Sequence, residues 1–128
     1  MTTNELSSII IGAAIEVHNT LGPGLLESFY EECLIHELKD LGLEVKEQVV
    51  VPIHYKGTKI QSKLKVDLIV QDKIIVELKA VQELSPIHAA QLLTYLKISN
   101  YRLGLLFNFN ELKIKNGLRR IINGQAPN

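Results

Sequence analysis

The chain has little cysteine, no long apolar run and no surplus of either charge, and each absence excludes a class of protein. The single cysteine, Cys33, excludes an intramolecular disulfide and a metal site built from several thiolates. No stretch of about 18 apolar residues occurs, so we expect no membrane-spanning helix and no membrane partner. Lysine and arginine number 14, and so do aspartate and glutamate, a balance that argues against binding nucleic acid by bulk charge alone.

The apolar segment near the start, residues 9–17, does not resemble a secretory signal. Glu5 precedes it without any lysine or arginine, and Glu16 interrupts it. We therefore expect a cytoplasmic protein. The 128 residues are 46% hydrophobic and 22% charged, which suits one globular core. No repeat or low-complexity linker divides the chain, so we expect a single domain over residues 1–128.

Hydrophobic periodicity predicts the order α-α-β-β-β-α-β. The helix near residue 85 has Ser85 as its N-cap and Pro86 at its first helical position. Residues 111–122 are ambiguous, and we expect a short strand followed by a helical turn there. The other predicted elements, in chain order, are helices over 4–20 and from the Leu-Gly-Pro-Gly break to about 41, strands at 44–55, 59–70 and 73–81, a helix over 85–100, and a buried strand at 101–109.

Charged residues interrupt two of the predicted strands. Glu77 and Lys79 stand two apart, so they share one face of their strand. A three-residue turn at 71–73 would place Asp67 opposite Glu77, and the three charges would then lie together. A two-residue turn would instead place Asp67 opposite Val76 and scatter the charges over both faces. The first register is compatible with the common three-residue hairpin loops.

Facing carboxylates repel each other, and their burial is costly without a positive partner. Lys79 could serve as that partner in an ion cluster at the edge of the sheet. A divalent cation would serve both Asp67 and Glu77, and oxygen ligands of this kind suit Mg²⁺, Mn²⁺ or Ca²⁺ better than zinc. The spacing alone leaves both interpretations open.

Three further polar residues have both a structural and a functional interpretation. Gln91 and Tyr95 are four apart on one helix face, where they could cover the rim of the core or line a site. Glu27 lies in the first turn of a helix, where the helix dipole alone favours a carboxylate.

Near the end of the chain is a run of basic residues with no acid between them, which is either a solvated surface or a phosphate contact. Its members are Lys113, Lys115, Arg119 and Arg120.

Together these motifs resemble the GxxExxY family, which is similar to the PD-(D/E)XK nuclease superfamily. Residues 24–30, Gly-Leu-Leu-Glu-Ser-Phe-Tyr, carry the G-x-x-E-x-x-Y pattern, and Asp67 followed by Glu77-x-Lys79 carries the nuclease signature. Residues 91–95 match the Q-x-x-x-Y motif of the RecB-type branch, and residues 104–109 resemble the strand that follows it. Val66 replaces the proline of the signature, but that proline is not a metal ligand.

The resemblance implies a restriction-endonuclease-like core, with a mixed central sheet flanked by helices, that hydrolyses phosphodiester bonds in DNA or RNA. It implies that Asp67, Glu77 and the Leu78 carbonyl hold Mg²⁺, with Mn²⁺ as the alternative ion. Lys79 would orient a water molecule or stabilise developing charge.

The resemblance also gives roles to residues outside the two strands. Glu27 would hold a water molecule or a second metal, and Gln91 and Tyr95 would position Lys79 and a phosphate. RecB-type enzymes use a histidine on the first helix, and the position of His18 leaves its membership of the site open.

The alternative function is a catalytically silent module that binds nucleic acid or a protein. A homodimer would supply further surface for a substrate.

Overall fold

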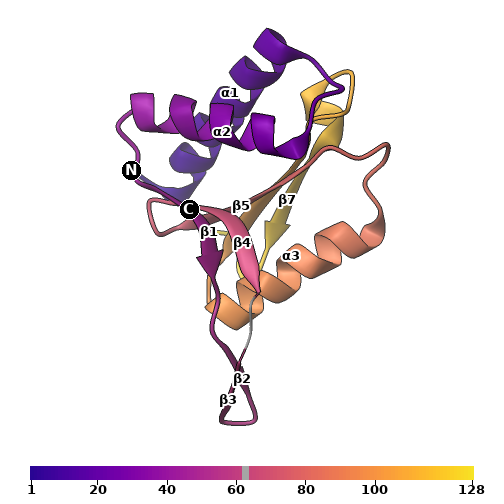
Figure 1. Ribbon diagram of the computed structural model, residues 1–128. Helices are drawn as coiled ribbons and strands as arrows, with labels where there is room; N and C mark the ends of the chain where they lie inside the picture. Colours follow the sequence, from indigo (N-terminus) through magenta and orange to yellow (C-terminus); the bar gives the residue numbers. More distant parts are fainter. Residues whose placement is uncertain (62–63) are drawn as a thin grey trace.

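The structure, a computed structural model, describes residues 1–61 and 64–128 (Figure 1). Within these residues one five-stranded sheet has the strand order β1-β4-β5-β6-β7, and a separate hairpin joins β2 to β3. Strands β5 and β6 are parallel and the other neighbours in the sheet are antiparallel. The elements are α1 (Thr3–Leu21), α2 (Glu27–Asp40), β1 (Val45–Val50), β2 (Ile53–Tyr55), β3 (Thr58–Ile60), β4 (Lys65–Val70), β5 (Ile74–Lys79), α3 (Pro86–Ser99), β6 (Leu103–Asn108), the 3₁₀ turn η1 (Ile114–Gly117) and β7 (Leu118–Ile122).

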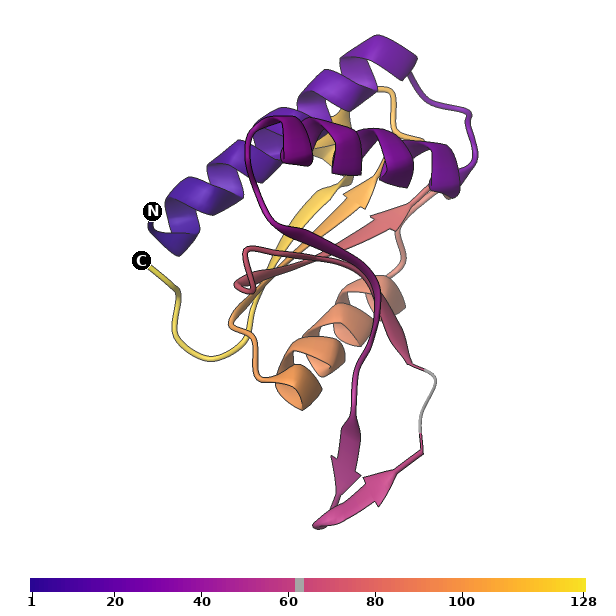
Figure 2. The same cartoon turned by 60° about the vertical axis from the view of Figure 1, so that its left-hand side comes forward.

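Helices cover both faces of the sheet, with α1 and α2 on one face and α3 on the other (Figures 1 and 2). On the α1–α2 face, Tyr30 and Leu34 pack in one buried cluster with Leu78 of β5. On the α3 face, Ile75 of β5 packs with Leu92 of α3 in a second cluster. Every residue of β6 is buried, because this central strand is covered on both sides. The mixed α/β architecture is the one that the sequence and its resemblance predicted.

Two of the predicted strands are each divided in the structure. Residues 44–55 form β1 and then β2, and Pro52 lies between them, where its missing N–H cannot join a ladder. Residues 59–70 form the end of β3 and then β4; positions 62 and 63, which the predicted strand covers, lie outside the described residues. In the first segment the hydrophobic pattern did not reveal the division, because β-branched residues lie on both sides of Pro52.

The prediction for residues 111–122 had its two elements in the wrong order. The helical turn η1 comes first, and β7 then pairs antiparallel with β6. Gly117 makes this path feasible, because a Cβ there would lie 2.5 Å from the carbonyl oxygen of Asn108. The strand therefore covers residues 118–122, and the lysines before it lie in the loop and in η1.

The hairpin between β4 and β5 has the predicted three-residue turn. Val70 pairs with Ile74, and the Lys73 N–H donates to the Val70 carbonyl at 3.0 Å. Gln71 and Asp72 make the turn with left-handed φ values of 54° and 51°. Continued by one more pair beyond Leu68–Val76, this register sets position 67 of β4 across from position 77 of β5.

The two ends of the described chain lie side by side in both views (Figures 1 and 2). The Asn4 N–H donates to the Asn128 carbonyl at 3.0 Å, and the Asn4 side chain donates to the Pro127 carbonyl at 3.0 Å. Among the helices that the structure describes, none is both long enough and apolar enough to cross a membrane.

Candidate active site

The two carboxylates of the predicted signature hold each other through the backbone. The Asp67 N–H donates to Oε1 of Glu77 at 3.0 Å, and the Leu78 N–H donates to Oδ2 of Asp67 at 2.9 Å. These bonds lie just beyond Leu68–Val76, the last regular pair between β4 and β5. Each acid is thus oriented by the strand that carries the other, and the two are fixed side by side.

The carbonyl of Leu78 also faces the Asp67 carboxylate, as the hydrogen-bonding pattern of β5 shows. The Phe109 N–H donates to the Lys79 carbonyl at 2.9 Å, so the backbone of Lys79 faces the β6 side. The backbone groups of adjacent residues in a strand alternate in direction, and Leu78 therefore faces the β4 side. Its N–H is already bonded to Asp67 there, which leaves its carbonyl beside that carboxylate.

Burial strongly perturbs Glu77. The residue is only 7% exposed. Desolvation first, and then the negative charge of Asp67, raise its pKa to about 8, although the Asp67 N–H and Lys79 act in the opposite direction. Glu77 therefore carries a proton for much of the time at neutral pH. Ionising Glu77 is costly because the group is buried beside Asp67 and no cation among the described residues neutralises the pair.

Lys79 lies at the end of β5, on the same face as Glu77 and half-buried. Among the described residues, no carboxylate lies within ion-pair distance of its ammonium group. The ion cluster in which Lys79 neutralises Asp67 and Glu77 is therefore not formed. Its charge acts at longer range, because it lowers the pKa of Glu77 and of Glu27 against larger opposing effects.

The G-x-x-E-x-x-Y segment places Glu27 by a turn that Tyr30 fixes. The Tyr30 hydroxyl donates to the Gly22 carbonyl at 2.6 Å and accepts from the Leu25 N–H at 3.0 Å. Gly24 has φ +98°, a conformation that favours glycine. Glu27 then begins α2, and its pKa is raised by partial burial and next by the charge of Asp67. The motif thus brings a third carboxylate toward Asp67.

Two residues that the sequence analysis did not select join this group. Nε2 of Gln48 donates to Oε1 of Glu31 at 2.8 Å and lies 3.4 Å from Oδ1 of Asp67. Partial burial raises the pKa of Glu31, although the bond from Gln48 opposes the rise; the charge of Asp67 adds to it. Glu31 could have been found, since it is four residues after Glu27 on the same helix face. Gln48 has φ 49° within β1, which no sequence pattern signals.

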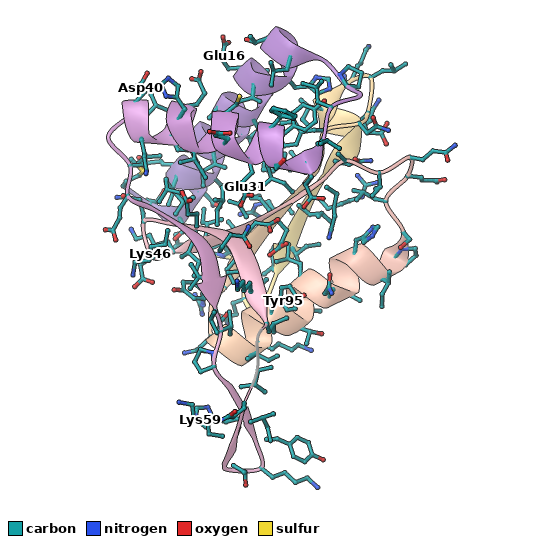
Figure 3. All side chains as sticks on the ribbon, viewed as in Figure 1. Glu16, Glu31, Asp40, Lys46, Lys59 and Tyr95 are labelled. Carbon is teal, nitrogen blue, oxygen red and sulfur yellow. The ribbon has the colours of Figure 1, made fainter. Side chains whose placement is uncertain are left out.

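Helix α3 approaches the carboxylates from the other face of the sheet. Tyr95 is half-buried, and its pKa is raised by burial and then by the charges of Glu77 and Asp67. Figure 3 shows Glu31 and Tyr95 on the helices at opposite sides of the sheet. Gln91 is exposed, one turn before Tyr95. In the described part of the chain neither side chain is hydrogen-bonded to Lys79, so the expected positioning contact is not formed.

His18 has a structural partner elsewhere. It is buried in α1, and its Nε2 lies 2.7 Å from the Glu111 carbonyl, in the loop after β6. Its ring also lies beside that of Phe109, with 6.4 Å between the centroids. None of these contacts involves Asp67 or Glu77, and the histidine connects α1 to the β6–η1 loop.

The donor set suits a hard divalent cation, although it is incomplete on its own. Asp67, Glu77 and the Leu78 carbonyl offer oxygen atoms, which Mg²⁺ and Mn²⁺ prefer. Among the described residues no three His, Cys, Asp or Glu side chains converge tightly enough for a ready-made metal site. A cation here would need backbone and water oxygens as well as the two acids, which is usual for Mg²⁺.

Comparison with known proteins gives the class of this fold and site. The family model of the PD-(D/E)XK nuclease superfamily matches residues 4–121. The chain belongs to that superfamily, whose nucleases generally use divalent metal ions and act on nucleic acid. Searches among curated proteins and among solved structures return no match.

Proposed function

We propose that this protein is a Mg²⁺-dependent nuclease that hydrolyses phosphodiester bonds in DNA or RNA. Asp67, Glu77 and the Leu78 carbonyl would hold the ion, with Mn²⁺ as the alternative. The main support is the fixed pair of Asp67 and Glu77. Glu77 is buried, Asp67 is partly buried, and neither has a cationic partner within ion-pair distance among the described residues. Membership of the superfamily supports the same activity.

The cation would lower the pKa of a water molecule and neutralise charge on the phosphate. The ammonium group of Lys79 would donate to that water or to a phosphate oxygen, because it is half-buried and free of an ion pair with any described residue. Glu77 would have to release its proton to act as a ligand, so binding of the cation would be favoured by rising pH.

The surrounding residues would complete the site from both faces of the sheet. Glu27, together with Glu31, would hold a water molecule or a second cation, since the charge of Asp67 affects both. Tyr95 would donate to a phosphate from α3, and Gln91 would join it when substrate is bound. The polar side chain of Gln48 would orient Asp67.

Within the superfamily we assign the chain to the GxxExxY family and to the RecB-type branch. The roles of Gly24, Glu27 and Tyr30 in the turn before α2 support the first assignment. The second rests on Gln91 and Tyr95 on one face of α3. We propose that residues 1–128 act as one domain, and that a homodimer would enlarge the surface available to a substrate.

A cleavage assay with the purified protein tests the proposed function. Plasmid DNA, single-stranded DNA and RNA are incubated with Mg²⁺, Mn²⁺ or EDTA, beside the variants Lys79→Ala and Lys73→Ala. We expect cleavage that EDTA abolishes. Lys79→Ala should lose about 10²–10³-fold in rate, the usual cost of removing one charge-stabilising donor. Lys73, in the turn at the other end of β5, serves as the matched control.

Two outcomes would contradict the mechanism in different ways. Full activity in a folded Lys79→Ala protein would remove Lys79 from the chemistry. Binding of nucleic acid without cleavage under any metal condition would favour the alternative, a catalytically silent binding module on the same fold.

A further inference from the structure

The β2–β3 hairpin projects from the body of the protein as an arm (Figures 1 and 2). It forms a two-stranded sheet of its own between β1 and β4, the strands that carry Gln48 and Asp67. None of its residues, Ile53–Tyr55 and Thr58–Ile60, belongs to a buried cluster of the described chain. A hairpin that buries so little contributes little to a core, so its exposed residues are free to contact a partner.

The charge of this arm is opposite to that of the carboxylate site. Residues 51–61 contain Lys56 and Lys59 and no aspartate or glutamate. Lys59 pairs across the hairpin with His54, and Lys56 occupies the turn. Lys59 stands on the projecting hairpin, away from the helices (Figure 3). The neutral total of the chain therefore conceals a separation, with acids at the site and cations on the arm.

The tip of the arm has a defined structure. Lys56 and Gly57 have φ values of 48° and 81°, as in the tight turns that match the twist of a hairpin. Tyr55 is 62% exposed, and Nζ of Lys56 lies 5.4 Å from the centre of its ring. The contact holds the ammonium group at the tip by cation–π attraction. An exposed aromatic ring and a fixed cation are thus presented together.

Tyr55 and Ile60 lie on one face of the hairpin, so the arm has an apolar side as well as a basic one. A second copy of the chain is the first candidate for covering that side. Each copy, however, would bring its own lysines without any acid on the arm to meet them, and like charges repel. A phosphodiester backbone offers the opposite charge. A two-stranded ribbon also fits the major groove of DNA, and exposed aromatic rings stack on unpaired bases.

We propose that the β2–β3 hairpin is a nucleic-acid-binding arm in which Lys56 and Lys59 bind phosphates outside the carboxylate site. The inference rests on the proposed function only in that both act on the same nucleic acid. From Gln48 to Tyr55 an extended chain spans at most about 23 Å, at about 3.3 Å per residue. That reach corresponds to about seven nucleotides of one DNA strand at about 3.4 Å each. The phosphates bound by the arm would therefore lie within about seven nucleotides of those near the carboxylates.

The salt dependence of binding tests the arm. Fluorescence anisotropy follows a labelled duplex of about 30 base pairs, and the matching single strand, over a salt series in EDTA, where the proposed hydrolysis does not proceed. The variant Lys56→Gln/Lys59→Gln is compared with Lys39→Gln/Lys73→Gln, which removes equal charge from the last turn of α2 and from the turn between β4 and β5. Each lost phosphate contact lowers the log–log slope by about 0.9 on a duplex or about 0.7 on a single strand.

We expect the arm variant to lower the slope by about two contacts on at least one probe, and the control variant to leave it unchanged. The probe that responds identifies a duplex or a single strand as the partner. Equal slopes in wild type and arm variant, equal losses in both variants, or no binding of either probe by wild type would overturn the proposal. Unchanged circular dichroism of the variants confirms that folding is preserved.

Further results distinguish nucleic-acid binding by the arm from a dimer interface and from the proposed nuclease activity. If Tyr55→Thr/Ile60→Thr converts a dimer to a monomer in light scattering while Lys56→Gln/Lys59→Gln leaves the slope unchanged, the apolar side belongs to a second copy and the arm is overturned. A changed slope in a protein that cleaves nothing keeps the arm and rejects only the nuclease. Cleavage with an unchanged slope keeps the nuclease and rejects the arm.

Discussion

Asp67 and Glu77 are bound to each other's strands, since the Asp67 amide donates to the Glu77 carboxylate while the Asp67 carboxylate accepts from the residue after Glu77. This exchange fixes two acids side by side where electrostatics alone would separate them. The backbone bonds offset part of the repulsion, and burial together with the remaining repulsion from Asp67 raises the pKa of Glu77. The consequences can be measured without any substrate.

Removing the charge of Asp67 should stabilise the metal-free protein or leave it unchanged. An asparagine side chain still offers an oxygen to the Leu78 N–H, and its lack of charge relieves the repulsion with Glu77. Thermal melts in EDTA should therefore give Asp67→Asn an equal or higher melting temperature than wild type. A clear destabilisation would indicate that the carboxylate is needed for structure and not for a ligand.

Magnesium should have the opposite effect on the same two proteins. Wild type should gain about 2.7 kcal/mol when Mg²⁺ is at a hundred times its dissociation constant. Asp67→Asn should lose most of this gain, because a hard cation prefers charged oxygens. Melts across a Mg²⁺ series measure both. If wild type shows no dependence on Mg²⁺, Asp67 and Glu77 do not form a metal site.

The stability of the metal-free protein should fall as the pH rises from about 4.5 to about 8. The pKa of Glu77 is about 8 in the folded state and 4.5 ordinarily, so the folded state keeps a proton that the unfolded chain releases. The stabilisation is complete below the lower value and is lost as pH passes through the upper one, at no more than about 1.4 kcal/mol per pH unit.

Urea unfolding in EDTA at several pH values measures this dependence. Glu77→Gln is the matched variant, because its amide oxygen can still accept from the Asp67 N–H. Its slope should be shallower than that of wild type. Some slope should remain, since the pKa values of Glu27 and Glu31 are also raised. Identical slopes in the two proteins would place the titrating group elsewhere.

The basic residues near the end of the chain should not contribute equally to nucleic-acid binding. The Arg119 guanidinium donates to the Asn116 and Leu118 carbonyls, and that of Arg120 donates to Asn4. Lys113 precedes η1 and Lys115 lies within it, and both are exposed after the C-terminal end of β6. Lys113→Gln/Lys115→Gln should therefore flatten the salt slope by about two contacts.

The matched control for these lysines is Arg119→Gln/Arg120→Gln, which removes the same charge from side chains already engaged within the protein. We expect a smaller change in the salt slope from this pair. A slope that neither variant alters would return the whole segment to a solvated surface.

Tyr30→Phe should destabilise the protein and displace Glu27. The hydroxyl of Tyr30 donates to the partly buried Gly22 carbonyl and accepts from the Leu25 N–H in the turn before α2. Leaving such groups unsatisfied costs about 1–3 kcal/mol. Urea unfolding measures the loss, and Phe109→Leu, which removes the ring stacked on Tyr30 at 4.7 Å, is the packing control. Wild-type stability in Tyr30→Phe would mean that the turn does not depend on the hydroxyl.

The sequence predicted those parts of the site that follow from strand alternation and short turns. The choice of a three-residue turn at 71–73 was enough to set Asp67 across from Glu77, and the structure confirms it. Gln48 could not be predicted in the same way, because its place beside Asp67 depends on pairing between β1 and β4 and on a left-handed residue within a strand. Such long-range pairings leave no local pattern in the sequence.

Two other results show where residue type alone was insufficient. His18 has the chemistry of a metal ligand, but its orientation is set by the Glu111 carbonyl, far along the chain. The lysines at 113 and 115 alternate as in a strand, yet the chain turns there because Gly117 packs against Asn108. In both cases a contact between distant residues overrides the local preference.

The hydrogen bonds between Asn4 and the last two residues hold the two ends of the chain close together. A short glycine-serine link from residue 128 back to residue 1 would then cross little space, and new ends could be opened between Lys56 and Gly57 at the hairpin tip. Surface turns of this kind tolerate circular permutation well. The permuted chain would keep the order of strands around Asp67 and Glu77, and β2 and β3 would become its terminal segments. The contribution of the arm could then be tested apart from that of the carboxylate pair without substituting any residue.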